Sequence, residues 1–204
     1  MKKLILASQS PRRSEILKKA GYQFVSFPVY VSEIPDKNLS LDGQILDIAK
    51  RKADEVLARL QAHSLGSDDA VILTADTMVC FADKALGKPD NDKMAAAYLR
   101  LLSGQKHQVK TALHLIDLIT GEQVFHIETT HVHFKELTED EIQNYIATGE
   151  PRDKAGAYAI QGLGGAFVEK FEGDFNNVVG LPLQALENLF RIKSWIFQKT
   201  LNGL

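Results

Sequence analysis

Two long strands joined by a tight turn constrain the fold of this 204-residue chain more than any other feature. Residues 108–118 and 122–134 are rich in apolar, β-branched and aromatic side chains, and Thr120-Gly121 between them is typical of a hairpin turn. A purely parallel sheet has no place for such a hairpin. Because helical patterns separate the other expected strands, the sequence predicts an α/β fold with a mixed, twisted sheet flanked by helices.

The rest of the chain alternates between strand and helix patterns. Residues 70–75 are almost continuously apolar, which favours a central strand covered on both faces, and residues 78–81 resume this pattern before a turn at 82–84. Further strands are expected at residues 3–7, 22–31 and 166–172, and helices at residues 11–20, 42–62, 91–102 and 138–148, with a helix pair at 183–202. We expect one domain over residues 1–204, with the possibility of two lobes around a cleft.

Composition excludes several functional classes. The formal charge of −2 comes from 24 Lys and Arg against 26 Asp and Glu, so no basic coat for a nucleic acid polymer is expected. Cys80 is the only cysteine, which rules out an intrachain disulfide and a cysteine metal cluster. No stretch reaches the roughly 18 apolar residues of a membrane helix, and the four apolar residues after Lys3 are too few for a secretion signal. We therefore expect a cytoplasmic protein without membrane association.

The sequence Ser8-Gln9-Ser10-Pro11-Arg12-Arg13 lies between a strand and a helix. Ser10 is placed to act as N-cap, with Pro11 as the first helical residue. Arg12 and Arg13 then fall at the positive end of the helix dipole, where each should cost roughly 0.3–1 kcal/mol. A bound phosphate chain would reverse that cost, because the hydroxyls of Ser8 and Ser10, free N–H groups and both guanidinium groups could converge on it. The alternative is a surface turn with two solvated arginines.

Asp76 directly follows the apolar run and should stand at or within the sheet, where its charge needs a positive partner. Lys52 projects from the helix at 42–62, Lys88 follows a short turn, and Glu33 follows the second strand. Such a mixture of acids and lysines suits polyphosphate hydrolysis, since carboxylates can hold a metal and cations can neutralise phosphate oxygens. Taken singly, each residue is equally consistent with an acid at a strand end or a solvated lysine.

Residues 150–165 contain four glycines before an apolar strand, which allows close approach of the backbone to a ligand. Gln161 in this segment could pair with uracil or thymine by accepting from N3–H and donating to O4. The alternative is a glycine loop that closes onto the sheet. His131 and His133, spaced two residues apart in the hairpin, are interpreted as one polar face of a strand and not as metal ligands.

With these segments in hand, the chain resembles the Maf (septum formation inhibitor) family over about residues 3–190. The matching motifs occur in order: Leu6-Ala7-Ser8-Gln9-Ser10-Pro11-Arg12-Arg13, Glu33, Lys52-Ala53, Ala75-Asp76-Thr77, Gly87-Lys88-Pro89, Leu102-Ser103-Gly104 with His107, Asp153-Lys154-Ala155-Gly156-Ala157-Tyr158, Ile160-Gln161-Gly162 and Asn177-Val178-Val179-Gly180-Leu181-Pro182. Nine separated matches do not arise by chance. There are small departures: Thr74 stands where a glycine often precedes Ala-Asp-Thr, and residues 173–177 differ from the usual Gly-Ser-Tyr-Ser-Asn.

The resemblance implies an elongated α/β fold with a deep cleft, similar to inosine triphosphate pyrophosphatases. It implies hydrolysis of a nucleoside triphosphate to the monophosphate and pyrophosphate, a requirement for magnesium, manganese or cobalt, and a homodimer. Asp76 matches the family's proposed catalytic base. Arg13, Glu33, Lys52 and Lys88 match its phosphate and metal cluster, with Glu33 and Asp76 as the expected metal ligands.

The positions that match the family's substrate discriminators are Arg12, Thr77 and Gln161. They are similar to the branch that acts on dTTP, UTP and modified pyrimidine nucleotides. The branch that acts on 7-methyl-GTP is expected to have an aromatic residue in place of Arg12 and Glu in place of Gln161. Two alternatives remain at this point: a pyrophosphatase for 7-methyl-GTP or non-canonical purine nucleotides, and a non-catalytic protein that inhibits septum formation.

Overall fold

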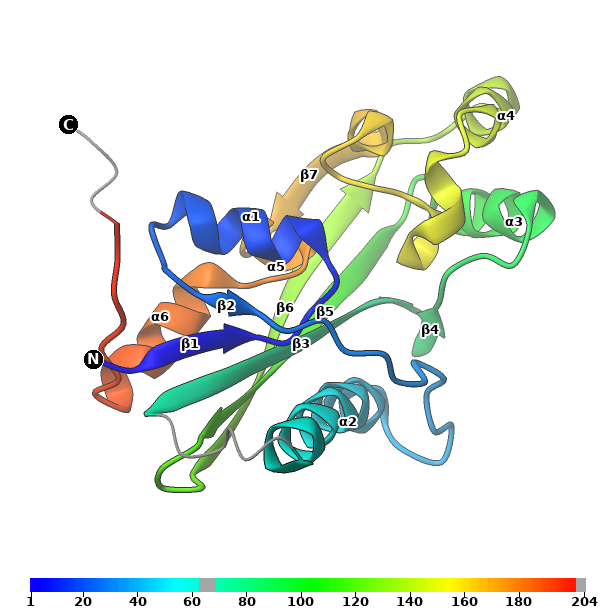
Figure 1. Cartoon of the computed structure of the whole chain (residues 1–204). Coiled ribbons are helices and arrows are strands. Elements are labelled where there is room, and N and C mark those ends of the chain that lie inside the picture. The colour runs from blue at the N-terminus through cyan, green and yellow to red at the C-terminus, as the bar shows by residue number, and fades with distance from the viewer. Residues whose placement is uncertain (63–68, 201–204) are drawn as a thin grey trace. The chain divides into compact units, whose positions relative to one another are not determined.

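The computed structural model describes residues 1–62 and 69–200 (Figure 1). Within this part of the chain, seven strands form one sheet in the order β2-β1-β3-β5-β6-β7, with β4 paired to β3. The strands are β1 Lys3–Leu6, β2 Val25–Ser26, β3 Ala70–Phe81, β4 Lys84–Leu86, β5 Lys106–Asp117, β6 Gln123–Phe134 and β7 Val168–Glu172. Strand β1 runs parallel to β2 and β3, whereas β4 is antiparallel to β3 and β7 to β6. The predicted mixed α/β sheet is therefore confirmed.

The helices are α1 Pro11–Lys19, α2 Leu41–Ala62, α3 Asp92–Leu102, α4 Glu139–Ala147, α5 Phe175–Val179 and α6 Leu183–Ile192. Three short 3-10 turns, Glu150–Asp153, Ala155–Ala157 and Leu163–Phe167, follow α4. The sequence Thr138-x-x-Glu141 is typical of a capping box, and the box is present at the start of α4. Thr138 Oγ1 accepts from the Glu141 N–H, and the Glu141 carboxylate accepts from the Thr138 N–H. None of the described helices is both long enough and apolar enough to cross a membrane.

The chain divides into two compact units, and β3, β5 and β6 each contribute to both. Unit 1 comprises Met1–Asp76, Thr111–Glu128 and Gly180–Leu204, and unit 2 comprises Thr77–Lys110 and Thr129–Val179. Each unit has its own apolar core. The expectations of a single domain, an elongated shape and a deep cleft stay predictions.

In unit 1, the alternation of side chains along β3 supplies both faces of the sheet. Ile72 packs with Ala53 and Val56 of α2, so this helix covers one face. Helix α1 lies on the opposite side of the strands from α2 (Figure 1). In unit 2, Leu99 of α3 and Ile142 of α4 share a buried cluster that also contains residues of β5 and β6.

Several local predictions were wrong. The strand expected at residues 22–31 is reduced to the two residues of β2, and β4 and α5 were missed. Of the helix pair expected at 183–202, α6 ends at Ile192, and residues 201–202 lie outside the described part. After Ser194, whose φ of 54° is left-handed, Trp195 and Phe197 are buried whereas Ile196 is 65% exposed. That two-residue period is the alternation of an extended chain, and Phe197 forms an isolated bridge with Lys2.

Candidate active site

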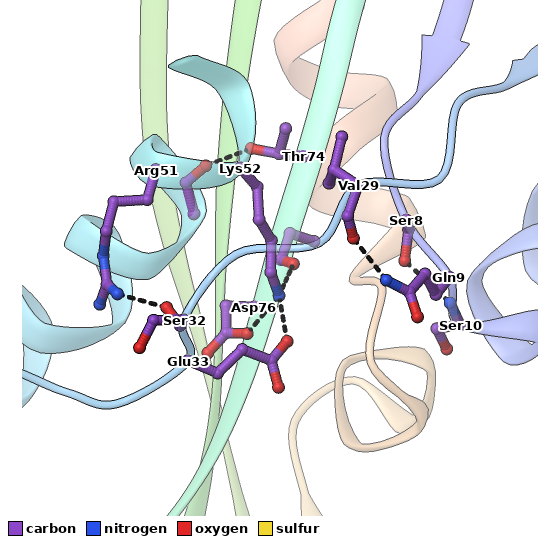
Figure 2. Close-up of polar contacts among 12 residues, drawn as sticks. Ser8, Gln9, Ser10, Val29, Ser32, Glu33, Arg51, Lys52, Thr74 and Asp76 are labelled. Atoms are coloured by element: carbon purple, nitrogen blue, oxygen red, sulfur yellow. Dashed lines mark hydrogen bonds and ion pairs between the residues drawn. The ribbon is translucent and has the colours of Figure 1, made fainter. Parts of the chain in front are cut away.

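A buried ammonium group binds two carboxylates at the centre of the candidate site in unit 1. Lys52 Nζ lies 2.7 Å from Asp76 Oδ1 and 2.8 Å from Glu33 Oε1 (Figure 2). The side chains of Lys52 and Asp76 are only 8% and 12% exposed, whereas that of Glu33 is 47% exposed. The structure thus brings together three of the residues that the sequence singled out, from α2, β3 and the coil between β2 and α2.

Helix α2 places Lys52 on its buried face, between Ala49 and Ala53, which are both fully buried. Its ammonium group also donates to the carbonyl oxygen of Ala75, at 3.4 Å. Strand β3 continues without interruption through Asp76, where the sequence indicated a break. The strand tolerates the carboxylate because the Lys52 ammonium group offsets part of the cost of burying its charge.

The segment before α1 is organised around Ser8. Its Oγ accepts from the Ser10 N–H at 3.1 Å and from Arg13 Nη1 at 3.2 Å. Ser10 occupies the N-cap position as expected, but its side chain makes no capping hydrogen bond. The expected side-chain cap is therefore wrong, and the hydrogen bond found here runs from the backbone N–H of Ser10 to the Ser8 hydroxyl.

Arg13 is buried, in contrast to the solvated arginine that the sequence left open. Its Nε donates to the carbonyl oxygen of Gly180 at 2.7 Å. Burial lowers the pKa of Arg13 from its ordinary value, while the negative charges of Asp76 and Glu33 oppose that shift. An arginine remains a cation even so, and Arg13 therefore adds a positive charge to the same neighbourhood of unit 1. Arg12, next to it in the first turn of α1, is half-buried.

Three of the predicted site residues belong to unit 2. Thr77 follows Asp76 in β3 and is half-buried, Lys88 follows β4 and is exposed, and Gln161 is exposed in the turn before the last 3-10 segment. Their place beside Lys52, Asp76 and Glu33 stays a prediction.

The glycines around Gln161 are explained by packing inside unit 2. A Cβ on Gly162 would lie 2.4 Å from Glu150 Oε1, and one on Gly165 would lie 2.5 Å from the carbonyl oxygen of Ile160. The Glu150 carboxylate accepts from the N–H groups of Leu163, at 3.0 Å, and Gly164, at 3.1 Å. The atoms that lie close to these glycines therefore belong to the protein itself. Packing within the protein accounts for the glycines without a ligand.

Two side chains that sequence reasoning missed hold the coil that carries Glu33. Gln9 Nε2 donates to the carbonyl oxygen of Val29 at 2.5 Å, and the Arg51 guanidinium donates to the carbonyl oxygen of Ser32 (Figure 2). The same guanidinium donates to the carbonyl oxygen of Ile34 at 3.0 Å. The sequence contained one hint of this role, because Gln9 is next to Ser8 and Arg51 is next to Lys52. A hydrogen bond to a backbone carbonyl oxygen cannot be inferred from the pattern of side chains, since every residue has such an oxygen.

The carboxylates of Asp76 and Glu33 fit a divalent metal. Both are hard oxygen donors, and both already lie within 2.8 Å of a single cationic nitrogen. Among the described residues, no group of three or more His, Cys, Asp and Glu side chains could hold a metal. Magnesium usually binds through one or two carboxylates together with water and the phosphates of a substrate, so two carboxylates can be enough for it.

The mixed sheet and these charges define an α/β protein with a candidate polyphosphate site, built from buried cations and two carboxylates. The chain belongs to the Maf-like protein family, whose model matches residues 3–192. It is 53% identical to a dTTP/UTP pyrophosphatase of Bdellovibrio bacteriovorus, over 91% of this chain and 96% of the relative. It is 44% identical to a dTTP/UTP pyrophosphatase of Caldicellulosiruptor saccharolyticus, over 94% of both chains, and 45% identical to one of a Geobacillus species, over 90% and 94%.

Proposed function

We propose that this chain is a nucleoside triphosphate pyrophosphatase that hydrolyses dTTP, UTP and modified pyrimidine nucleotides to the monophosphate and pyrophosphate. The observation that carries the proposal is the Lys52 ammonium group held between Asp76 and Glu33. A buried ion-paired set with two acids is costly to build, and hydrolysis of a phosphoanhydride gives it a use. The names of the relatives supply the substrates.

In the proposed reaction, Asp76 orients a water molecule for in-line attack on the α phosphorus and accepts its proton. A bond forms between the water oxygen and the α phosphorus, and the bond from that phosphorus to the oxygen bridging to the β phosphate breaks, so that pyrophosphate leaves. Arg13, Lys52 and Lys88 neutralise the charge on the phosphate oxygens. Glu33 and Asp76 would hold a divalent metal, magnesium, manganese or cobalt, which as a Lewis acid polarises phosphoryl oxygens.

The remaining predicted residues would bind the substrate. Ser8 and Ser10 would donate their hydroxyl groups to phosphate oxygens near the start of α1. Arg12, Thr77 and Gln161 would select the nucleotide, and the Gln161 amide matches the edge of uracil or thymine. Formation of a homodimer, a cytoplasmic location and a link to cell-division arrest rest on the family resemblance alone, and sedimentation of the purified protein tests the dimer.

The direct test is pyrophosphate release from purified protein with magnesium or manganese, across dTTP, UTP, CTP, GTP, ITP and 7-methyl-GTP. We expect release from dTTP and UTP well above release from the others. Preference for 7-methyl-GTP or ITP would move the chain to the purine alternative. Absence of release from every nucleotide with either metal would overturn the proposed activity in favour of a non-catalytic septum-formation inhibitor.

A further inference from the structure

Glu33 has an unusual setting for a residue with a proposed chemical role. It lies in residues 27–36, which belong to no helix or strand, and its side chain is nearly half exposed. Packing alone therefore does little to fix its carboxylate. Yet that carboxylate must stay near Lys52 if it is to act with Asp76, so other contacts must hold this coil in place.

Arg51 provides such contacts on both sides of Glu33. Its Nη1 donates to the carbonyl oxygen of Ser32 (Figure 2). Its Nη2 donates to the carbonyl oxygen of Ile34 at 3.0 Å. Asp47, one turn earlier in α2, lies 3.0 Å from the same Nη2 and orients the guanidinium group. Helix α2 therefore fixes Glu33 in two ways. Arg51 binds the backbone on both sides of Glu33, and Lys52 binds the Glu33 carboxylate.

We propose that Arg51 is a positioning residue, which fixes Glu33 for the reaction without contacting the substrate. The planar fork of an arginine can reach two carbonyl oxygens at once, with its donors in fixed geometry, whereas a lysine offers a single point charge. The substitution Arg51→Lys therefore keeps the charge facing Asp47 and removes the fork. The inference rests on the proposed function, because it takes Glu33 to act in the proposed reaction.

Arg59 in the same helix provides a matched control. It pairs with Glu55 at 2.6 Å, as Arg51 pairs with Asp47, and it donates to the carbonyl oxygen of Pro28 at 3.5 Å, five residues before Glu33. We expect Arg51→Lys to lower kcat/KM for dTTP about tenfold, as is usual when a group that orients a metal ligand is lost. Arg59→Lys should leave kcat/KM unchanged. Equal values for the two variants would overturn the proposal.

A double-mutant cycle separates positioning from general stabilisation. If Arg51 acts through Glu33, Arg51→Lys should cause no further loss of kcat/KM in a Glu33→Gln background. Hydrogen exchange of residues 29–36 should accelerate in Arg51→Lys, while exchange in α2 stays at its original rate. Losses that multiply in the double variant, or unchanged exchange in residues 29–36, would show that Arg51 does not position Glu33. A wild-type protein without pyrophosphate release would instead contradict the proposed function, and a fully active Glu33→Gln variant would contradict the role of Glu33 on which this inference rests.

Discussion

The two units bury polar groups of different kinds. Of the residues that the structure describes, four buried ones carry a formal charge, and all four lie in unit 1: Arg13, Lys52, Asp76 and Asp117. Unit 2 buries only His107, Thr130 and Asn177 among its polar side chains. Burying a charge requires a compensating partner, whereas a neutral group needs only a hydrogen bond.

In unit 2, the buried side chains of His107, Thr130 and Asn177 form hydrogen bonds to neutral partners. His107 Nε2 lies 2.8 Å from the Tyr158 hydroxyl, and Asn177 Nδ2 donates to Thr130 Oγ1 at 3.0 Å. Such groups serve the core of the unit. In unit 1, by contrast, replacing a buried ion pair by apolar residues is often neutral or stabilising, so the pair formed by Lys52 and Asp76 needs a reason other than stability. The proposed catalytic role provides such a reason, and the comparison can be tested.

The largest effect is expected from Asp76→Asn, which removes the proposed base and keeps the shape of the side chain. Turnover of dTTP should fall about a thousandfold, within the range typical for loss of a general base, while nucleotide binding is largely kept. Steady-state kinetics together with a binding titration measure both quantities. An Asp76→Asn protein with full activity would exclude Asp76 as the base.

Asp117→Asn is the matched control within unit 1. Asp117 is also buried, pairs with Lys2 at 2.9 Å and accepts from the Ile119 N–H at 3.0 Å, but it has no proposed role in the reaction. This variant should lose stability and keep its kcat. A loss of turnover as large as that of Asp76→Asn would mean that turnover depends on any buried charge in unit 1 through its effect on the fold. The buried charges of unit 1 would then no longer indicate a catalytic site.

The next largest effect is a dependence of the free energy of unfolding on pH, which arises in unit 2. Burial lowers the pKa of His107 from 6.5 to about 4 in the folded protein. Between these values the unfolded chain binds the proton more readily, so the free energy of unfolding decreases as the pH falls from 6.5 towards 4 and is level above 6.5. At pH 5 the loss relative to pH 7 should be about 2 kcal/mol.

Denaturant unfolding of the wild type and of His107→Gln at pH 7 and pH 5 measures this contribution. The variant is needed because burial also lowers the pKa of His114 in unit 1, which adds a change of the same sign. His107→Gln should therefore show a smaller decrease between the two pH values than the wild type. An identical decrease in both proteins would show that His107 is protonated equally in the folded and unfolded states.

The sequence predicted what depends on neighbouring residues or on regular alternation. The capping box of α4 joins residues three apart, and the hairpin of β5 and β6 follows from alternation around a glycine turn. The pairing of Lys52 with Asp76 was also within reach, because a charge in an apolar strand demands an opposite one. Strand β4 and helix α5 are too short to show a period.

The contacts that order the coil before α2 were not predictable. Gln9 and Arg51 donate to backbone carbonyl oxygens, which every residue has, so no side-chain pattern marks the acceptor. The same limit applies to the loop of Gln161. Its glycines suggested room for a ligand, but the atoms that fill the space belong to Glu150 and Ile160, which only the folded chain shows.

The smallest effect is expected at Thr74. Thr74 is fully buried, and its Oγ1 donates to the carbonyl oxygen of Ala49 in α2 at 2.8 Å. Thr74→Val keeps the volume and removes this donor, so the free energy of unfolding should fall by about 1 kcal/mol. Turnover should stay close to that of the wild type, because β3 keeps its pairing with β1, which aligns Leu73 with Leu6.

Thermal unfolding and dTTP kinetics of Thr74→Val test whether a neutral buried group of unit 1 contributes to stability alone, in contrast to the charged pair of Lys52 and Asp76, which is proposed to act in turnover. A loss of stability with normal turnover is the expected result. The Thr74 hydroxyl group joins α2 to β3, and its hydrogen bonds go to the carbonyl oxygens of Ala49 and His114 and not to Lys52 or Asp76. A marked loss of turnover would instead mean that the register of α2 on β3 sets the distance between the ammonium group and the carboxylate. Thr74 would then act through Lys52, in the way proposed for Arg51 and Glu33.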